Sequence, residues 1–273
     1  MAIAKADLIE GMAKGMAVLE SFDTERQRLN ATLAAQRAGL TRAAARRHLL
    51  TLAHLGYLET DGSYFWLAPK VLRFSGSYLG SARLPRLSQP TLNRLAAQTQ
   101  ESFSVVVRDS DEVVIVARSG NDRAEAINLL DGQGGMVGEG RRARILAYGL
   151  HLGARLPAFA TSTGRVLLAS LNRTEFAAWM KGRGFHRLTA HTLTEAKAIR
   201  AVVAQARADD FCVTSEEHEI GVHALAVPLR NLQGRTMAAL NVVTSPQRLQ
   251  QEVMRRELLP LLQEAARELR PLL

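Results

Sequence analysis

The sequence predicts an α+β protein with two domains, a small one of helices and a hairpin followed by a larger one of antiparallel strands and helices. Two short helical segments meet at Gly39, and alternating apolar and polar residues follow around Asp61-Gly62, a pair typical of a tight hairpin turn. Strand-like runs at 102–120 and 211–245 enclose helical segments between 163 and 210, as in α+β domains. A chain of 273 residues with 47% hydrophobic content is long enough to bury two cores.

Helical periodicity defines the start of the small domain. Residues 7–22 place apolar side chains at helical spacing and predict a first helix. The segment 29–40 has Asn30 as a possible N-cap and predicts a short second helix. A third helix is predicted over 41–55, with Thr41 as its natural N-cap. Two helices joined by a tight glycine-containing turn are typical of a helix-turn-helix.

A hairpin completes the small domain. Residues 56–69 alternate in polarity around the Asp61-Gly62 turn and predict two short strands directly behind the third helix. Such a hairpin is a wing, so the sequence predicts a winged helix-turn-helix over residues 1–69.

The third helix carries positive charge that no neighbouring acidic residue compensates. Arg42, Arg46 and Arg47 fall on the side opposite to its leucine-rich, core-facing stripe. The whole chain has a formal net charge of +9, which favours a polyanionic partner. In a helix-turn-helix the second helix enters the DNA major groove, where the arginine fork matches guanine or phosphate.

These observations predict binding to double-stranded DNA. An exposed helix with a solvated basic face is the alternative interpretation of the arginines alone. The predicted DNA contacts come from the N-terminal half of the third helix and from the wing, which can reach the backbone or the minor groove. They are Thr41, Arg42, Ala43, Arg46, Arg47, Ser63 and Tyr64.

The rest of the chain divides into a linker and a large domain. A linker helix is predicted over 70–84, and the large domain over 85–273. Pro85 and Pro90 interrupt the chain before an amphipathic helix begins, and residues 119–143 form a glycine-rich insertion with no sustained period.

The large domain is predicted to alternate strands with helices. Two strands form a hairpin within 102–120, and 144–162 is a further strand-like region. Three helices are expected between 163 and 210, followed by three strands with Gly234 in a turn. A long helix is expected from Pro246 to the end of the sequence.

Other classes of protein find little support in the sequence. Cys212 is the single cysteine, the N-terminus does not read as a signal peptide, and no apolar stretch is long enough to span a membrane, so a cytoplasmic protein is expected. No phosphate-binding loop, serine-nucleophile elbow or zinc-protease motif occurs, so we expect neither a cofactor nor an enzyme. The run SEEHEIGVH (215–223) gathers acidic residues and histidines, but its spacing matches no zinc pattern and its side chains would alternate along a strand.

Several blocks of sequence together resemble one family. They are GMAVLESF, LAAQRAGLTRAAARRHLLTLAHLGYLETDGSYFWLAPKVL, LGARLPAFATSTGRVLLASL, SEEHEIGVHALAVPLRN and GRTMAALNVVTSPQRL. In this order they resemble the IclR family of bacterial transcriptional regulators over nearly the whole chain. The block RLPAFATSTGRVLLASL is similar to the branch that controls aromatic-acid catabolism. The insertion at 119–143 is the main departure from the family's pattern.

The resemblance implies a winged helix-turn-helix that dimerises and a C-terminal α/β effector-binding domain with a curved antiparallel, GAF-like sheet. Dimers of the family commonly pair into tetramers. Members of the branch respond to compounds such as 4-hydroxybenzoate, protocatechuate, phthalates or β-ketoadipate, and many of them are activators. The family's effector pocket maps onto positions in the third quarter and the last strands of this chain. They are Ser162, Thr163, Thr214, Ala224, Asn241 and Val243.

Physical reasoning points to the same pocket. In ATSTGR (160–165) small hydroxyl residues precede a helix, whose free N–H groups and dipole favour a carboxylate. Ser162 could instead merely cap that helix. His223 is a possible donor to a ring hydroxyl or carboxylate, with a structural histidine as the alternative. Tyr148 and Phe159 are candidates for an apolar wall, with buried aromatic packing as the alternative.

The sequence therefore predicts a ligand-responsive transcriptional activator of an aromatic-acid catabolic operon, working as a homodimer or tetramer. One alternative is a repressor that senses a non-aromatic carboxylate such as β-ketoadipate. A second is an enzyme of aromatic metabolism with a fused basic domain, and a third is a DNA-binding protein without a ligand.

Overall fold

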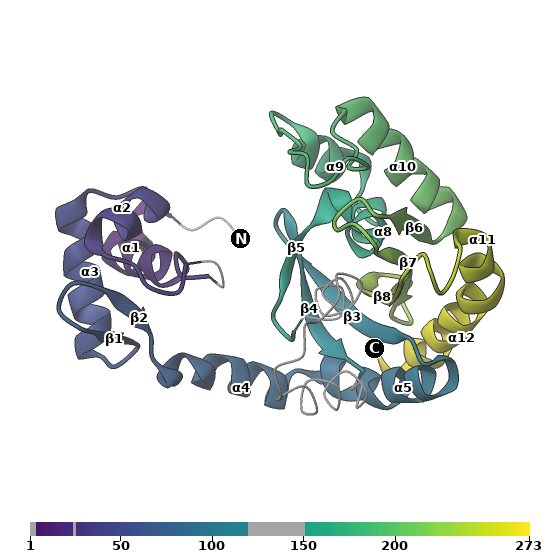
Figure 1. Cartoon of the computed structure of the whole chain (residues 1–273), viewed down its shortest axis with the longest axis horizontal. Helices are drawn as coiled ribbons and strands as arrows, with labels where there is room; N and C mark the ends of the chain where they lie inside the picture. The colour runs from purple at the N-terminus through teal and green to yellow at the C-terminus, as the bar shows by residue number, and fades with distance from the viewer. Residues whose placement is uncertain (1–3, 24–25, 120–150) are drawn as a thin grey trace, which may run out of the picture. The chain divides into compact units, whose positions relative to one another are not determined.

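The structure is a computed structural model that describes residues 4–23, 26–119 and 151–273. The chain divides into two compact units, Met1–Ser81 and Ala82–Leu273, each with its own elements (Figure 1). Tyr148 and nearly all of the predicted 119–143 insertion lie outside the described residues. Among the described residues, no helix is both long and apolar enough to cross a bilayer.

The described part of the first unit contains four α-helices and a two-stranded sheet. Its elements are α1 Glu10–Leu19, α2 Ala31–Ala38, α3 Arg42–His54, β1 Leu58–Thr60, β2 Phe65–Leu67 and α4 Leu72–Ser81, and a 3₁₀ turn, Pro69–Val71, precedes α4. The strands pair antiparallel, with Glu59 opposite Trp66. The expected winged helix-turn-helix is confirmed.

Side-chain caps set the ends of α2 and α3. Asn30 accepts hydrogen bonds from the backbone N–H groups of Thr32 and Leu33, and Thr41 accepts one from Ala44. Gly39 ends α2 in the left-handed conformation, at a φ of 65°, which glycine adopts without steric cost. The predicted caps and the glycine stop are therefore confirmed, and they fix the tight turn between the two helices.

The core of the first unit is small and made of residues from every predicted element. It contains Val18, Phe22, Leu29, Ala34, Ala35, Ala45, Leu49, Leu58 and Phe65. In contrast, Leu8, Ile9, Met12 and Met16 of the first helix and its approach stay exposed. An apolar stripe at helical spacing therefore reaches this core only at its C-terminal end.

The second unit contains a six-stranded sheet and two groups of helices. Its strands are β3 Ser102–Asp109, β4 Glu112–Arg118, β5 Arg155–Pro157, β6 Cys212–Ser215, β7 His223–Arg230 and β8 Thr236–Thr244. Its helices are α5 Arg83–Thr99, α8 Ser162–Ala169, α9 Arg173–Met180, α10 Ala196–Asp209, α11 Gln251–Val253 and α12 Leu259–Leu269, with a π-helical stretch at Met254–Leu258.

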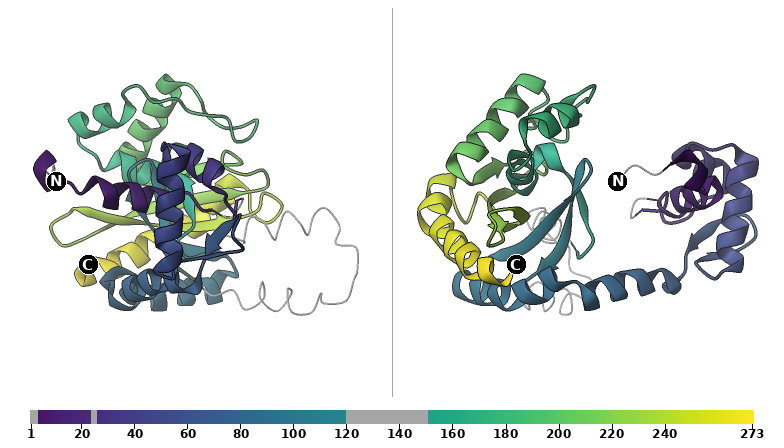
Figure 2. Two further views of the ribbon diagram at one scale, coloured as in Figure 1. Left: turned by 90° about the vertical axis from the view of Figure 1, so that its left-hand side faces the viewer. Right: turned by 180° about the vertical axis from the view of Figure 1, so that it is seen from behind.

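The sheet is antiparallel throughout, in the order β5-β4-β3-β8-β7-β6, and it is visibly curved (Figure 2). Helices α8, α9 and α10 cover one face with a core that includes Ala226 and Ala239. Helices α5 and α12 cover the other face with a core that includes Leu225 and Leu240. Because side chains alternate across a strand, each strand feeds both cores, and the expected curved antiparallel sheet is confirmed.

Three details of the second unit differ from the sequence predictions. Helix α5 runs unbroken through Pro90, because the buried Leu92 and Leu95 pack onto the sheet and offset one lost backbone hydrogen bond. Residues 216–222 form a loop, so their side chains do not alternate as in a strand. The closing helical region begins at Gln251 rather than at Pro246, because residues 245–250 form a turn after β8.

Candidate functional site

Helix α3 of the first unit exposes a basic face. Ala45 and Leu49 are fully buried on its inner side, whereas Arg42, Arg46 and Arg47 are exposed. None of the three guanidinium groups makes a hydrogen bond or ion pair with a side chain of the described residues. Three unpaired cations on the second helix of a helix-turn-helix are suited to contact the phosphates and base edges of DNA.

The wing beside α3 is rigidified by its own turn. The Asp61 carboxylate accepts hydrogen bonds from the N–H groups of Tyr64 and Ser63 at 2.8 and 3.0 Å. These bonds hold the pKa of Asp61 below its usual value. Ser63 and Tyr64, both predicted to contact DNA, are exposed at this turn. The guanidinium carbon of Arg28 stacks 4.6 Å from the centroid of the Trp66 ring, which adds a cation to the wing.

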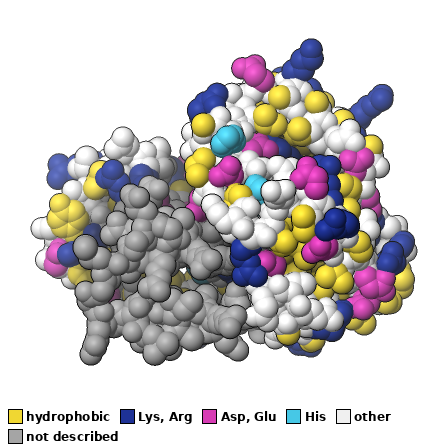
Figure 3. All heavy atoms as spheres, turned by 45° about the vertical axis from the view of Figure 1, so that its right-hand side comes forward, with side chains coloured by type: hydrophobic (Ala, Val, Ile, Leu, Met, Phe, Trp, Pro, Cys, Tyr) yellow, Lys and Arg dark blue, Asp and Glu magenta, His cyan; other side chains and the backbone are white. Residues whose placement is uncertain are grey.

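Basic and acidic side chains are distributed differently on the second unit. On the face drawn in Figure 3 they are interspersed over its surface, with apolar side chains between them. An interspersed surface creates no strong field of one sign. The face shown is therefore less suited than the basic face of α3 to bind a polyanion.

The second unit contains a cavity on the α8 face of its sheet. It has about 680 Å³ of empty volume, part of which is open to solvent. Strands β3, β4, β6, β7 and β8, the N-terminus of α8 and the loop 216–222 all contribute to its wall. The lining residues are Ser102, Ser104, Val106, Ile115, Arg118, Leu156, Ala160, Thr161, Ser162, Thr163, Thr214, Glu217, His218, Glu219, Val222, Ala224, Asn241 and Val243.

Six of the nine predicted effector contacts lie in this wall. They are Ser162, Thr163, Thr214, Ala224, Asn241 and Val243. Thr161 is the N-cap of α8, accepting from Gly164 N at 3.1 Å, so Ser162 is the first helical residue and does not cap the helix. The Ser162 hydroxyl oxygen and the Asn241 Oδ1 oxygen are buried without a hydrogen-bond partner among the described residues. Buried polar groups are rarely left unpaired, so both are available to a ligand.

The other three predicted contacts are not part of the described wall. His223 precedes Ala224 on β7, so its side chain points to the opposite face of the sheet, where Nδ1 lies 3.2 Å from the Leu249 carbonyl oxygen. Phe159 is buried in a cluster with Phe185, at 5.1 Å between ring centroids. This geometry favours the structural alternatives, a structural histidine for His223 and buried aromatic packing for Phe159. Tyr148 is outside the described residues.

Sequence reasoning missed several polar residues of the wall. Arg118 ends β4, and its Nη2 donates to the Ser102 hydroxyl at 3.1 Å. His218 and Glu219 come from the loop 216–222. Ser102 and Ser104 alternate with Phe103 and Val105 on β3, and this period of two is a usable signal that one face of the strand is polar. No local sequence pattern marks Arg118 as a cavity residue, because strand pairing brings it to the wall.

Burial changes the protonation of the two loop residues. It lowers the pKa of His218, so the imidazole is neutral over a wider range of pH. It raises the pKa of Glu219, so this carboxyl keeps its proton to a higher pH than an exposed glutamate. Both shifts favour the neutral form of the side chain, which can still donate or accept hydrogen bonds.

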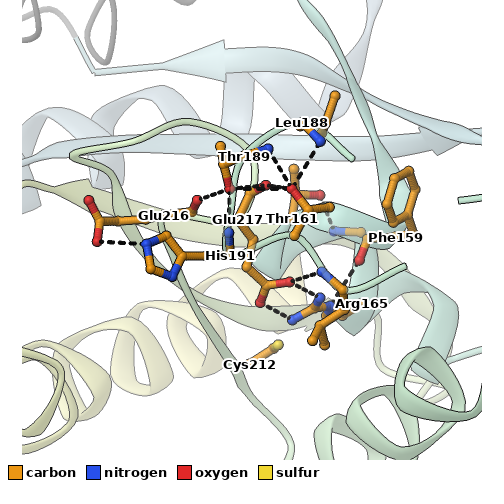
Figure 4. Close-up of polar contacts among 12 residues, drawn as sticks. Phe159, Thr161, Arg165, Leu188, Thr189, His191, Cys212, Glu216 and Glu217 are labelled. Atoms are coloured by element: carbon orange, nitrogen blue, oxygen red, sulfur yellow. Dashed lines mark hydrogen bonds and ion pairs between the residues drawn. The ribbon is translucent and has the colours of Figure 1, made fainter. Parts of the chain in front are cut away.

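A buried ion pair joins the cavity wall to α8 (Figure 4). Arg165 of α8 is 1% exposed, and its Nη1 and Nη2 atoms donate to the two carboxylate oxygens of Glu217 at 2.6 and 2.5 Å. Its Nε donates to the Phe159 carbonyl oxygen at 3.0 Å. Bidentate pairing of this kind is the strongest arrangement of a guanidinium and a carboxylate. It joins the helix whose N-terminus lines the cavity to the loop that faces it.

Catalytic and metal chemistry have no geometry to support them in the described part of the chain. There, no group of three or more His, Cys, Asp and Glu side chains is placed to hold a metal ion. Burial raises the pKa of the Cys212 thiol to about 11, so it is protonated and a poor nucleophile.

The chain matches known proteins along its whole length. Residues 11–62 match the model of the IclR helix-turn-helix domain, and residues 136–270 match that of the bacterial transcriptional regulator IclR C-terminal domain. The Pca operon regulatory protein of Acinetobacter baylyi is 48% identical over 267 residues, which cover 98% of this chain and 90% of that protein. This chain belongs to the IclR family. It is a transcriptional regulator, and the resemblance inferred from the sequence is confirmed.

Two further matches come from regulators of aromatic metabolism. The p-hydroxybenzoate hydroxylase transcriptional activator of Acinetobacter baylyi is 48% identical over 266 residues, covering 97% of this chain and 92% of that protein. The inducer-binding domain of the Acinetobacter transcription factor PobR, solved as a double mutant with 3-hydroxybenzoic acid, is 43% identical with a TM-score of 0.58. It covers 69% of this chain and 98% of that domain. The family's helix-turn-helix and C-terminal domains are thus both present in this regulator.

Proposed function

We propose that this regulator activates an operon of aromatic-acid catabolism when a small hydroxybenzoate occupies the cavity of its second unit. The observation that carries the proposal is the pair of buried, unpaired oxygens of Ser162 and Asn241 in one cavity wall. The similar regulators of Acinetobacter, one of them named for p-hydroxybenzoate hydroxylase, favour an aromatic acid over other carboxylates.

The N-terminus of α8 is the expected site for the carboxylate of the ligand. The first N–H groups of a helix have no acceptor within it, and its dipole places partial positive charge there. The Ser162 hydroxyl, 1% exposed, adds a donor at the same end. Thr163 and Thr214 contribute further hydroxyls, and neither brings a negative charge that would repel an anion.

The remaining wall suits an aromatic ring with a hydroxyl substituent. Val106, Ile115, Leu156 and Val243 offer apolar contact to a ring face. Asn241 Oδ1 is an acceptor that a phenolic hydroxyl can satisfy. A cavity with a few polar groups on an apolar wall selects ligands by the position of their own polar groups, so ring position of the hydroxyl is expected to matter.

The DNA contacts are proposed at the exposed basic face of α3 and at the wing. Arg42, Arg46 and Arg47 supply charge-assisted hydrogen bonds to bases and phosphates. Thr41 and Ala43, exposed in the first turn of α3, allow close approach of the helix to a base edge. Ser63 and Tyr64 reach the backbone from the wing.

A cytoplasmic homodimer or tetramer is the proposed working form. Leu8, Ile9, Met12 and Met16 are exposed together in the first unit, and a contiguous exposed apolar patch marks an interaction surface. A two-fold pair of winged helices also matches the symmetry of palindromic operators. Light scattering of the purified chain tests this directly, since a monomer at micromolar concentration would contradict it.

Calorimetric titration with 4-hydroxybenzoate, 3-hydroxybenzoate and protocatechuate tests the ligand class. Wild type is expected to bind at least one of them, and Ser162→Ala to weaken that binding by about 1.5–3 kcal/mol through loss of one hydrogen bond to a charged group. Ser170→Ala is the matched control, because the Ser170 hydroxyl at the end of α8 bonds the Leu167 carbonyl and does not line the cavity. Binding that is unchanged in Ser162→Ala would remove α8 as the carboxylate site.

A further inference from the structure

The loop 216–222 contributes four residues to the cavity wall, and two of them are acidic. Glu217, His218, Glu219 and Val222 all face the cavity. A carboxylate in the wall of a site for a carboxylate ligand costs binding energy unless its charge is compensated. The buried Arg165 is the cation that compensates Glu217, because it holds both carboxylate oxygens.

The same loop also contacts residues 189–193, where Leu193 N donates to Glu217 Oε2 at 3.4 Å and His191 Nε2 lies 3.9 Å from Glu216 Oε2. The Thr192 hydroxyl donates to the Glu217 carbonyl oxygen at 2.7 Å, and the Thr189 hydroxyl to that of Glu216 at 2.6 Å. Within the loop, Glu216 Oε1 accepts from Gly221 N at 2.8 Å. Figure 4 shows Thr189 and Glu216 on one side of Glu217 and Arg165 on the other. Among the hydrogen bonds and ion pairs of the described residues, the Arg165–Glu217 pair is the one that joins the loop to α8, where Ser162 and Thr163 line the cavity.

We propose that Arg165 is a positioning residue for effector binding. It fixes the loop 216–222 against the N-terminal helix of the cavity, and it cancels the charge that Glu217 would otherwise present to an anionic effector. Neither residue is offered as a ligand contact. The inference rests on the proposed function, which places a carboxylate in this cavity.

The proposal predicts a loss of binding that depends on the charge of the ligand. In Arg165→Met the Glu217 carboxylate is left uncompensated beside the cavity. Affinity for 4-hydroxybenzoate is then expected to fall at least about tenfold, from the Coulomb repulsion of two charges a few ångströms apart. Affinity for the neutral 4-hydroxybenzamide is expected to fall less than about threefold, since no such repulsion acts on it. A purely structural role of Arg165 would weaken both ligands equally.

Two further variants keep the test decisive if Arg165→Met does not fold. Glu217→Gln leaves Arg165 as an uncompensated cation, so the preference for the benzoate over the benzamide is expected to rise. The double variant Arg165→Met, Glu217→Leu removes both charges, and apolar replacement of a buried ion pair is often neutral for stability. It is expected to bind the two ligands in the wild-type ratio, while amide hydrogen exchange in 216–222 is faster.

Arg230→Met is the matched control. Arg230 also forms a bidentate pair, with Asp210, but it lies at the end of β7 away from the cavity wall. For the Arg230→Met variant, the ratio of the affinity for the benzoate to that for the benzamide is expected to equal the wild-type ratio.

The outcomes separate the two proposals. If wild type binds neither ligand nor any other hydroxybenzoate, the proposed function fails, and hydrogen exchange of 216–222 still tests the loop. If wild type binds but all charge variants keep its ratio of affinities, or if exchange in 216–222 is unchanged without Arg165, the positioning role is overturned.

Discussion

The two units of this regulator hold their functional side chains in opposite ways. In the first unit, Arg42, Arg46 and Arg47 project from one helix and make no side-chain pairs among the described residues. In the second, Arg165 is buried and its nitrogens are engaged by Glu217 and the Phe159 carbonyl. An unpaired exposed guanidinium points to a partner outside the protein, whereas a buried paired one sets the position of its neighbours. Substitutions of the exposed arginines in the first unit should therefore change binding alone, and substitution of Arg165 in the second should change both binding and stability.

The largest expected effect is on the stability of the second unit, at Gly164 of α8. A Cβ atom there would lie 2.0 Å from the Ala158 carbonyl oxygen, which belongs to the backbone and cannot move aside. Gly164→Ala is expected to lower the free energy of unfolding by about 3 kcal/mol or more, as an extreme case of overpacking. Chemical denaturation followed through Trp179, the tryptophan of the second unit, measures it.

The same substitution in the first unit should have the opposite sign. Gly15 lies inside α1, and a Cβ there would meet only His48 Nδ1 at 3.5 Å, an ordinary contact. Gly15→Ala is expected to stabilise the unit by about 0.5–1 kcal/mol, because alanine favours a helix interior. Equal effects at Gly15 and Gly164 would contradict the contrast between the units.

The next largest effect is on DNA affinity. Arg46→Ala and Arg47→Ala are each expected to weaken binding by about 1–3 kcal/mol, the range for a lost base or phosphate contact. Stability should change by less than about 0.5 kcal/mol, since both side chains are exposed. Fluorescence anisotropy with a duplex enriched from a random pool by the wild-type protein measures the affinity.

Arg37→Ala is a suitable control for this measurement. Arg37 ends α2 and is already paired with Asp23 inside the unit. Arg37→Ala should therefore change DNA affinity less than Arg46→Ala or Arg47→Ala does. If all three variants bind DNA as tightly as wild type, the basic face of α3 is merely solvated and the proposed DNA contacts are contradicted.

The smallest expected effect is a pH dependence of ligand binding. Glu219 has its pKa raised by burial, so it stays neutral until the pH exceeds the ordinary glutamate range. As the pH rises through the raised pKa, Glu219 becomes an anion and affinity for a hydroxybenzoate should fall, on the order of threefold for a partly screened charge. Glu219→Gln should flatten this part of the profile in calorimetric titrations.

The neighbouring His218 affects a different part of the same profile. Its pKa is lowered, so it gains a proton only below the ordinary histidine range, where a positive charge would strengthen anion binding. His218→Asn should leave the fall above the glutamate range in place. If Glu219→Gln keeps the wild-type profile, the raised pKa of Glu219 is not coupled to the ligand.

The contrast between the units also explains what the sequence predicted well. Asn30, Gly39, Thr41 and the Asp61-Gly62 turn act through neighbours a few residues away, so their roles are readable from local signals. The start of helix α5 was not predictable in this way, because packing on the sheet outweighs the helix-breaking effect of Pro90.

The cavity was predictable only in part. Ser162, Thr163 and Asn241 follow from the family's pattern and the helix N-terminus, and they lie in the wall. His223 alternates with Ala224 along β7, so strand parity favours the structural alternative for this histidine over the effector contact. Arg118 comes from a strand far away in the sequence, so only the sheet order brings it to the cavity.

The most direct test of the central claim is a thermal-shift measurement of the full chain with 4-hydroxybenzoate, 3-hydroxybenzoate, protocatechuate and the neutral 4-hydroxybenzamide. A ligand that binds only the folded state at a hundredfold excess over its dissociation constant adds about 2.7 kcal/mol of stability. Our account predicts that at least one hydroxybenzoate raises the melting temperature clearly more than the benzamide. No shift with any of the acids, or an equal shift with the benzamide, would contradict a cavity built for an aromatic carboxylate.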